Sequence, residues 1–174
     1  MIYIGEKRNI STERMTQNDP LLGPKIALYE PDIPQNTASI IRTCSCLGVA
    51  LEIIEPCGFL TSDKRFKRVV MDYMDYNKIK FYKNYKEFLD NKKNDRIILM
   101  TTKAKKNYTN FKFSKKDTIL FGRESAGVPK KIHNKIKDKL KISMINGKRS
   151  LNLSTTVSMV LSESIRQINL DYGN

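Results

Sequence analysis

Short, continuous apolar runs alternate along this chain with segments whose apolar residues recur at helical spacing. The runs predict strands at Ile26–Tyr29, Leu51–Ile54, Ile97–Met100, Ile119–Phe121 and around Ile142–Ile145. Helical patterns fall on the segment carrying Ile40, Ile41, Cys44 and Leu47, on Tyr85–Asn91, after Pro129, and on Ser154–Ile168. Strands alternating with helices predict a parallel sheet, and unbroken apolar strands are typical of a sheet buried on both faces. We therefore expect a single-domain α/β fold with helices on both faces of a parallel sheet.

The first 25 residues do not share this pattern. They are polar, show no sustained hydrophobic periodicity, and end in the proline- and glycine-containing stretch Pro20-Leu21-Leu22-Gly23-Pro24, which is typical of a turn or loop. We interpret 1–25 as a partly ordered N-terminal extension and 26–174 as the folded domain.

Several classes of function are disfavoured by what the sequence lacks. The three cysteines, an odd number, do not suggest a disulfide framework. His133 is the only histidine, so a His-based zinc site or a Ser-His-Asp triad is improbable and no metal is expected. Neither GxGxxG after a strand nor GxxxxGK[ST] occurs. No apolar stretch approaches the ~20 residues of a membrane span, so we expect a cytoplasmic protein without a membrane partner.

The charge is strongly positive. Lys and Arg total 32 against 18 acidic residues, a formal net charge of +14, and residues 61–118 alone hold 17 basic and 7 acidic residues. A positive face of this kind suits a nucleic acid, because neutralised phosphates release condensed counterions. The alternative is a lysine-rich composition that places Lys on any solvated face.

Small and polar residues follow three of the predicted strands. The segments are Glu30–Thr37, Phe121–Pro129, and the stretch from Ile142 through Ser150–Ser154. Ligands of open parallel sheets bind at the carboxyl ends of the strands. Taken singly, each segment also has a plain structural interpretation, as turn glycines or a helix N-cap.

Together and in this order, the segments resemble the three motifs of the SPOUT RNA methyltransferases. The matching stretches are Asn36-Thr37-Ala38-Ser39-Ile40-Ile41-Arg42, Phe121-Gly122-Arg123-Glu124 to Gly127, and Ser150-Leu151-Asn152-Leu153-Ser154. Three further stretches resemble the TrmL-like branch, the small tRNA (cytidine/uridine-34)-2′-O-methyltransferases: Tyr29 to Asn36, Ile54 to Phe59, and Asp63-Lys64-Arg65 followed by Asp72-Tyr73. One departure is Ser162, which stands where the branch commonly has tyrosine.

The resemblance implies a fold, a cofactor and a partner. The C-terminal part would form a deep trefoil knot, and S-adenosylmethionine would bind in the knotted loops. Main-chain groups near Met100, Gly122 and Ile142 would hold the cofactor, with Ser150 beside it. The family also implies a homodimer that acts on tRNA, here on the anticodon stem-loop.

The motif positions also imply catalytic roles. Arg42 would be the catalytic arginine, and Asn36 would orient it and the substrate phosphate. Glu124 would stabilise the second loop, while Ser150 and Asn152 would support the cofactor pocket and the reacting ribose. A guanidinium keeps its proton to a pKa above ~12, so we expect Arg42 to bind phosphate and stabilise the incipient alkoxide.

Two basic runs are then candidates for RNA contact. They are Lys64, Arg65, Lys67 and Arg68, which we expect beside the site, and Lys103, Lys105 and Lys106. Two alternatives stay open: a related enzyme acting on another tRNA position or on ribosomal RNA, and an RNA-binding protein that has lost catalysis.

Overall fold

A computed structural model describes residues 23–70, 79–92, 95–146, 148 and 150–170 of the 174. Most of the predicted N-terminal extension lies outside these residues. The first strand begins at Lys25, one residue before the predicted domain boundary.

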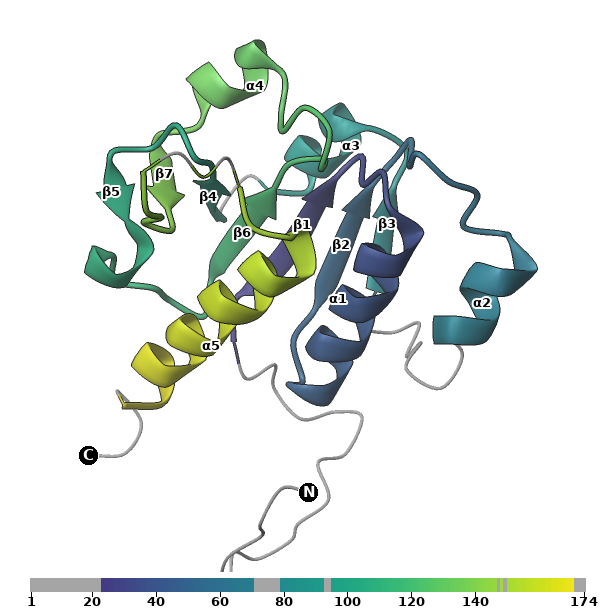
Figure 1. The fold of residues 1–174 in the computed structure, drawn as a ribbon, viewed down its shortest axis with the longest axis horizontal. Helices are drawn as coiled ribbons and strands as arrows, with labels where there is room; N and C mark the ends of the chain where they lie inside the picture. Colours follow the sequence, from purple (N-terminus) through teal and green to yellow (C-terminus); the bar gives the residue numbers. More distant parts are fainter. Residues whose placement is uncertain (1–22, 71–78, 93–94, 147, 149, 171–174) are drawn as a thin grey trace, which may run out of the picture.

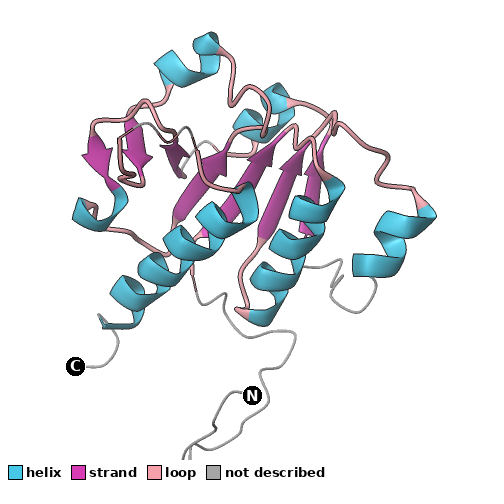
Figure 2. Cartoon of the chain, in the orientation of Figure 1, coloured by secondary structure: helices cyan, strands magenta, loops and turns pink. Residues whose placement is uncertain are grey.

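The described residues form one parallel sheet and its flanking helices (Figures 1 and 2). In chain order the elements are β1 (Lys25–Tyr29), α1 (Pro34–Cys46), β2 (Leu51–Ile54), α2 (Lys64–Val70), β3 (Ile79–Tyr82), α3 (Tyr85–Asp90), β4 (Arg96–Met100), β5 (Lys106–Asn107), the 3₁₀ helix η1 (Tyr108–Asn110), β6 (Asp117–Phe121), α4 (Lys130–Lys135), β7 (Asp138–Lys141) and α5 (Leu153–Leu170). The strand order is β3-β2-β1-β6-β4-β7-β5, and neighbouring strands run parallel.

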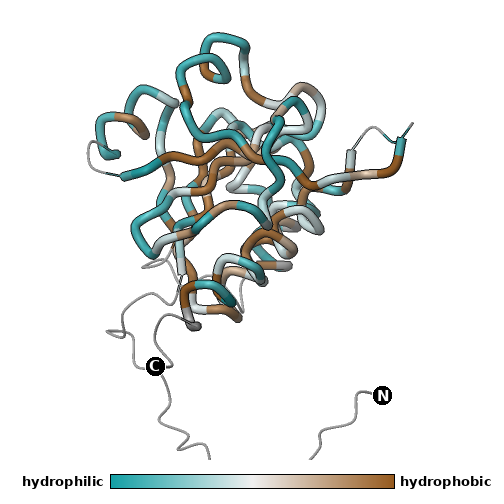
Figure 3. The backbone as a smooth tube through the Cα atoms, turned by 90° about the vertical axis from the view of Figure 1, so that its left-hand side faces the viewer, coloured by the Kyte–Doolittle hydropathy of each residue, from teal (hydrophilic) through white to brown (hydrophobic). Residues whose placement is uncertain are grey.

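Both faces of the sheet are covered, as predicted. Alternate residues of β1 enter different cores: Ile26 and Leu28 pack with α1, α2 and α5, whereas Ala27 and Tyr29 pack with α3 and the region of α4. Side chains of a strand point alternately to the two faces, so an unbroken apolar strand supplies both cores. Figure 3 shows the hydrophobic stretches gathered in the central strands and the hydrophilic ones in the outer loops.

The last helix, predicted at Ser154–Ile168, is present as α5 and buries one of its faces. Val157, Val160, Leu161, Ser164 and Ile168 are all buried, and α5 lies beside α1 in front of the sheet (Figure 1). Ser164 fits among apolar neighbours because its hydroxyl donates to the backbone oxygen of Leu161 at 2.8 Å.

The strand expected around Ile142–Ile145 is displaced. The strand is β7, Asp138–Lys141, and residues 142–145 follow it as a loop. Only Leu140 of β7 is fully buried, so its charged sequence lacks the apolar run that marks the central strands. The short edge strands β3 and β5 were not predicted for the same reason.

The register aligns the carboxyl ends of the central strands. Leu28 of β1 pairs with Phe121 of β6, which pairs in turn with Met100 of β4. The chain therefore leaves three neighbouring strands at one edge of the sheet, and the segment after β7 returns to the same edge to begin α5.

Candidate functional site

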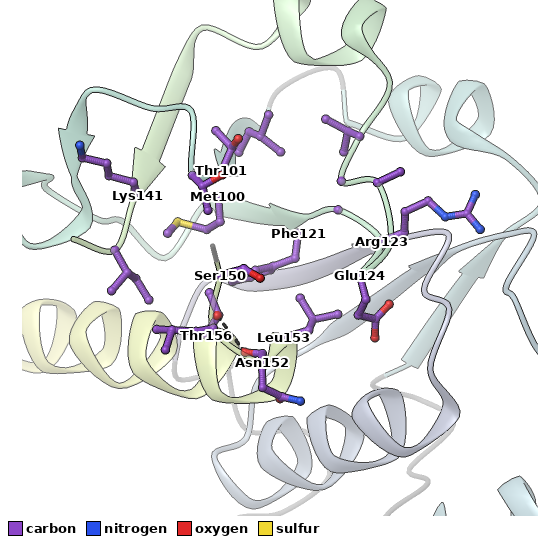
Figure 4. Close-up of a pocket in the computed structure, with 18 of the residues that line it drawn as sticks. Met100, Thr101, Phe121, Arg123, Glu124, Lys141, Ser150, Asn152, Leu153 and Thr156 are labelled. Atoms are coloured by element: carbon purple, nitrogen blue, oxygen red, sulfur yellow. Dashed lines mark hydrogen bonds between the residues drawn. The ribbon is translucent and has the colours of Figure 1, made fainter. Parts of the chain in front are cut away.

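A pocket of about 610 Å³ opens where these strand ends meet (Figure 4). Its walls come from the start of α1, the loops after β4, β6 and β7, and the first turn of α5. Met100, Phe121, Ile142 and Leu153 supply apolar surface, and Thr101, Ser150 and Asn152 supply polar groups. The volume falls within the roughly 300–1,000 Å³ of small-ligand sites.

A chain of hydrogen bonds joins the three predicted motifs. The Asn152 side-chain nitrogen donates to the Asn36 oxygen at 2.9 Å, and the Asn36 nitrogen donates to Glu124 Oε1 at 2.9 Å. Glu124 Oε2 accepts from the backbone N–H of Asp32 at 2.8 Å. The residues are 88 and 116 positions apart in sequence, so this chain fixes the relative positions of the three segments.

Asn152 also caps α5. Its side-chain oxygen accepts from the backbone N–H groups of Ser154 at 2.9 Å and Thr155 at 3.3 Å, and from the Ser154 hydroxyl at 2.7 Å. The structure therefore confirms Asn152 as an N-cap, while the nitrogen end of the same amide joins the hydrogen-bond chain at the pocket.

The loop after β6 is a tight, closed turn. Arg123 and Gly127 exchange two backbone hydrogen bonds, 2.8 and 3.3 Å long, and Gly127 has φ +70°. A Cβ on Gly122 would lie 2.5 Å from the carbonyl carbon of Gly127. Gly122 is therefore required by close backbone contact, which also leaves its main chain bare at the pocket wall.

Charged groups hold this loop against the segment after β1. Arg123 Nε and Nη2 both donate to Asp32 Oδ1, and Arg123 Nη1 lies 3.3 Å from Glu30 Oε2. Asp32 Oδ2 accepts from the Ser125 hydroxyl at 2.6 Å. Donation by Arg123, followed by that of Ser125, lowers the pKa of Asp32 to about 2.

All the predicted cofactor-binding residues line the pocket, and so do four of the five predicted catalytic residues. They are Met100, Gly122, Ile142, Ser150, Asn36, Glu124 and Asn152. Arg42 is the exception: it lies on the exposed side of α1, roughly 9 Å along the helix from Asn36, and is not among the described lining residues.

The predicted RNA-binding residues fall in two places. Lys103 lines the pocket, and Lys105 and Lys106 are exposed nearby, with Lys106 Nζ 4.9 Å from the centre of the Phe111 ring. Lys64, Lys67 and Arg68 are exposed on α2; of Arg65 only the backbone is described. Helix α2 follows β2 and packs on α1, so it lies toward the β3 edge with α1 between it and the pocket (Figure 1).

The pocket also brings in polar and charged residues that were not predicted as site residues. Thr101, Lys141 and Thr156 line it, and Asp32 anchors the loop that forms one wall. The opposite charges of Asp32 and Arg123 are visible in the sequence, but their pairing depends on β1 and β6 being neighbours, which the sequence does not reveal.

The residue chemistry favours a ligand with an apolar ring and several polar edges. Met100 and Ile142 supply apolar side chains to the same pocket in which Gly122 offers only main chain. Among the described residues, no group of three or more His, Cys, Asp or Glu side chains could hold a metal ion. None of the described helices is long and apolar enough to cross a membrane.

A family model matches most of the chain. Residues 24–162 match the SpoU rRNA Methylase family. A tRNA (cytidine(34)-2′-O)-methyltransferase of Beijerinckia indica is 42% identical over 145 residues, covering 82% of this chain and 91% of the relative.

Solved structures share the architecture. One that concerns the 2-OH methylation of C/U34 on tRNA has a TM-score of 0.78 and 32% identity, covering 83% of this chain and 95% of its own. An AdoMet-bound rRNA methyltransferase of Sinorhizobium meliloti has a TM-score of 0.74 at 21% identity, covering 85% of this chain and 60% of its own, and supports the fold alone.

Proposed function

The chain belongs to the SpoU rRNA methylase family, and from this premise we propose that it methylates the ribose 2′-oxygen of the wobble nucleotide, C34 or U34, of a tRNA. The methyl donor is S-adenosylmethionine. The observation that carries the proposal is the pocket in which Asn36, Glu124 and Asn152 tie the three motifs together. The Beijerinckia relative supports the choice of substrate, because the match extends over most of both chains.

The pocket residues fit this donor. The main chain at Gly122 and near Met100 and Ile142 would hold the adenosine part, because Gly122 has no side chain and the other two residues add apolar surface to the same pocket. Ser150 would lie beside it. When bound, S-adenosylmethionine supplies a methyl group on a positively charged sulfur, which is itself activated, so we propose that no metal takes part.

The protein residues align the acceptor and stabilise its charge. A ribose hydroxyl is a weak nucleophile, so the enzyme must hold it in line and stabilise the oxygen as its proton leaves. Asn36 would orient the substrate, and its own position is fixed by Glu124 and Asn152. Arg42 would bind the adjacent phosphate and stabilise the developing alkoxide, remaining protonated throughout.

The other proposed properties concern assembly and substrate docking. We propose a homodimer that uses α5 and the motif segments. The partly exposed Leu151 and Met159 support this interface. The return of the chain from β7, beyond β4, to α5 beside α1 supports a deep trefoil knot in the C-terminal part. The basic residues of α2 and of residues 103–106 would carry the anticodon stem-loop in the cytoplasm, with binding that weakens steeply as salt rises.

The test is methylation of tRNA by the purified protein. Wild type with S-adenosylmethionine should place one 2′-O-methyl mark at position 34, located by nucleoside mass spectrometry of nuclease fragments. A matched stem-loop with 2′-deoxyribose at position 34 should accept none. A mark elsewhere, or on ribosomal RNA, would replace the proposed substrate, and binding of RNA without any methyl transfer would replace catalysis.

Arg42 provides the matched variants. Arg42→Ala should lose turnover while its affinity for S-adenosylmethionine stays near that of wild type, and Arg42→Lys should keep some activity if positive charge suffices. Greatly weakened donor binding in Arg42→Ala would contradict the phosphate-binding role.

A further inference from the structure

Arg123 is a lining residue of the pocket, but its side chain is directed away from the centre of the pocket (Figure 4). Its guanidinium instead reaches Asp32 with two nitrogens and Glu30 with the third. The Arg123 side chain is 33% exposed, and the Asp32 side chain is 19% exposed. The Arg123 guanidinium thus forms a half-buried link between the loops that follow the neighbouring strands β1 and β6.

The contacts between these loops run in both directions. The Asp32 carboxylate accepts from Arg123 on one oxygen, and from the Ser125 backbone N–H and hydroxyl on the other. The Asp32 backbone N–H in turn donates to Glu124 Oε2. Three consecutive residues of the second motif, Arg123 to Ser125, therefore form hydrogen bonds with Asp32. Of these three, Glu124 also accepts the hydrogen bond from Asn36.

The backbone at the start of this segment supports a fixed geometry. Glu30 has φ +43°, in the left-handed region that side chains other than glycine rarely occupy. Such a conformation persists where surrounding contacts determine it. Here Arg123 binds the Glu30 carboxylate, and the Glu30 backbone N–H donates to the Ile54 oxygen at 2.9 Å.

We propose that Arg123 and Asp32 form a positioning pair that sets the affinity of the pocket for the methyl donor. Neither touches the reacting atoms. The pair holds the closed turn of residues 123–127, and this turn together with Gly122 forms one wall of the pocket. This inference rests on the proposed function, since it takes S-adenosylmethionine as the ligand of the pocket.

Another Arg–Asp pair of the chain, Arg96 and Asp117, provides a matched control. Arg96 Nε and Nη2 donate to the two oxygens of Asp117 at 2.8 and 2.7 Å. This pair lies where β4 and β6 begin, at the opposite ends of the strands from the pocket. Replacing arginine by lysine leaves the charge and removes the guanidinium fork at either place, so the same substitution is compared beside the pocket and far from it.

The experiment measures binding of S-adenosylhomocysteine by calorimetry, below the melting temperature of each variant. Arg123→Gln should weaken binding about tenfold or more, within the range usual for coupled sites, and Arg123→Lys should weaken it less. Arg96→Lys should lower the melting temperature while affinity stays within about twofold of wild type, since that pair is remote from the ligand. In turnover, the KM for the donor should rise in the Arg123 variants and the KM for RNA should not.

Three outcomes separate the claims. If folded Arg123→Gln binds the ligand as wild type does, the positioning role is wrong; if this variant does not fold, Arg123→Lys decides by the same comparison. If Arg96→Lys weakens binding as much as Arg123→Lys, the effect is general destabilisation and the inference fails. If wild type itself binds no S-adenosylhomocysteine, the proposed function fails first.

Discussion

Replacing Glu124 by glutamine tests whether the hydrogen-bond chain through the pocket has a fixed direction. Both oxygens of Glu124 accept hydrogen bonds, one from the Asn36 side-chain nitrogen and one from the backbone N–H of Asp32. Glutamine has the same shape but one acceptor oxygen and one NH₂ donor. One of the two contacts in Glu124→Gln must therefore place a donor against a donor.

Rotating the amides cannot remove this mismatch. If Asn36 turned its oxygen toward the introduced glutamine, its nitrogen would face the nitrogen of Asn152. If Asn152 also turned, its nitrogen would face the N–H groups of Ser154 and Thr155 that now donate to its oxygen. Backbone donors close both ends of the chain, so each rotation moves the mismatch and none removes it.

The expected loss follows from one unsatisfied polar contact in a partly buried network. Such a contact costs about 1–3 kcal/mol. In a chain of this size each kcal/mol lowers the melting temperature by about 2–4 °C. Thermal unfolding measures the change directly, and calorimetry with S-adenosylhomocysteine shows whether the pocket loosens with it.

A second substitution should restore the chain. An aspartate in place of Asn36 offers two acceptor oxygens, one for the nitrogen of the introduced glutamine and one for the Asn152 nitrogen, so Asn36→Asp with Glu124→Gln satisfies every contact again. Asn36→Asp alone sets two carboxylates against each other and should be destabilised. The double variant should therefore melt above at least one single variant, while turnover should stay low if Asn36 orients the substrate as proposed. If the stability losses of the two single variants simply add in the double variant, or if Glu124→Gln melts at the temperature of wild type, the reasoning is refuted.

Three further predictions concern the turn, the core and acid stability. Gly122→Ala should abolish donor binding in calorimetry, because the new Cβ falls 2.5 Å from the Gly127 carbonyl carbon. Lys92→Met should lower the free energy of unfolding, measured with denaturant, by about 3–5 kcal/mol. The substitution leaves the Glu52 carboxylate, which is 7% exposed and binds Lys92 at 2.7 Å, without its cationic partner. Adding Glu52→Gln should recover part of this loss of stability. The Arg123 contacts lower the pKa of Asp32 from 3.8 to about 2, so their stabilisation is present above pH 4 and lost as pH falls toward 2. The melting temperature of Asp32→Asn should accordingly fall less than that of wild type between pH 5 and pH 2.

The sheet could be predicted from the sequence only where burial is complete. β1, β2, β4 and β6 are apolar because both of their faces are covered. β7 reads Asp-Lys-Leu-Lys, with only Leu140 fully buried, and the apolar residues after it belong to the loop at the pocket. Apolar residues that line a pocket and apolar residues that fill a core thus look alike in a sequence.

Within the site, the motif residues were predictable and their supports were not. Asn36, Glu124 and Asn152 could be proposed from a resemblance carried by their order along the chain. The pairs Asp32–Arg123 and Glu52–Lys92 depend on which strands are neighbours. The β3-β2-β1-β6-β4-β7-β5 order is a property of the packed chain, and opposite charges in a sequence this rich in lysine do not identify their partners.

The position of Arg42 bears on how the proposed reaction is divided among the residues. Asn36 and Arg42 belong to one helix, but only Asn36 is buried at the pocket, held by Glu124 and Asn152. A guanidinium on the exposed side of α1 can meet a phosphate brought by the RNA without forming part of the donor site. Substitution of Arg42 should therefore lower turnover with RNA while donor affinity stays near that of wild type, whereas Gly122→Ala should lose donor binding and, with it, turnover. Loss of donor affinity in Arg42→Ala would mean that one arrangement of the loops serves both ligands.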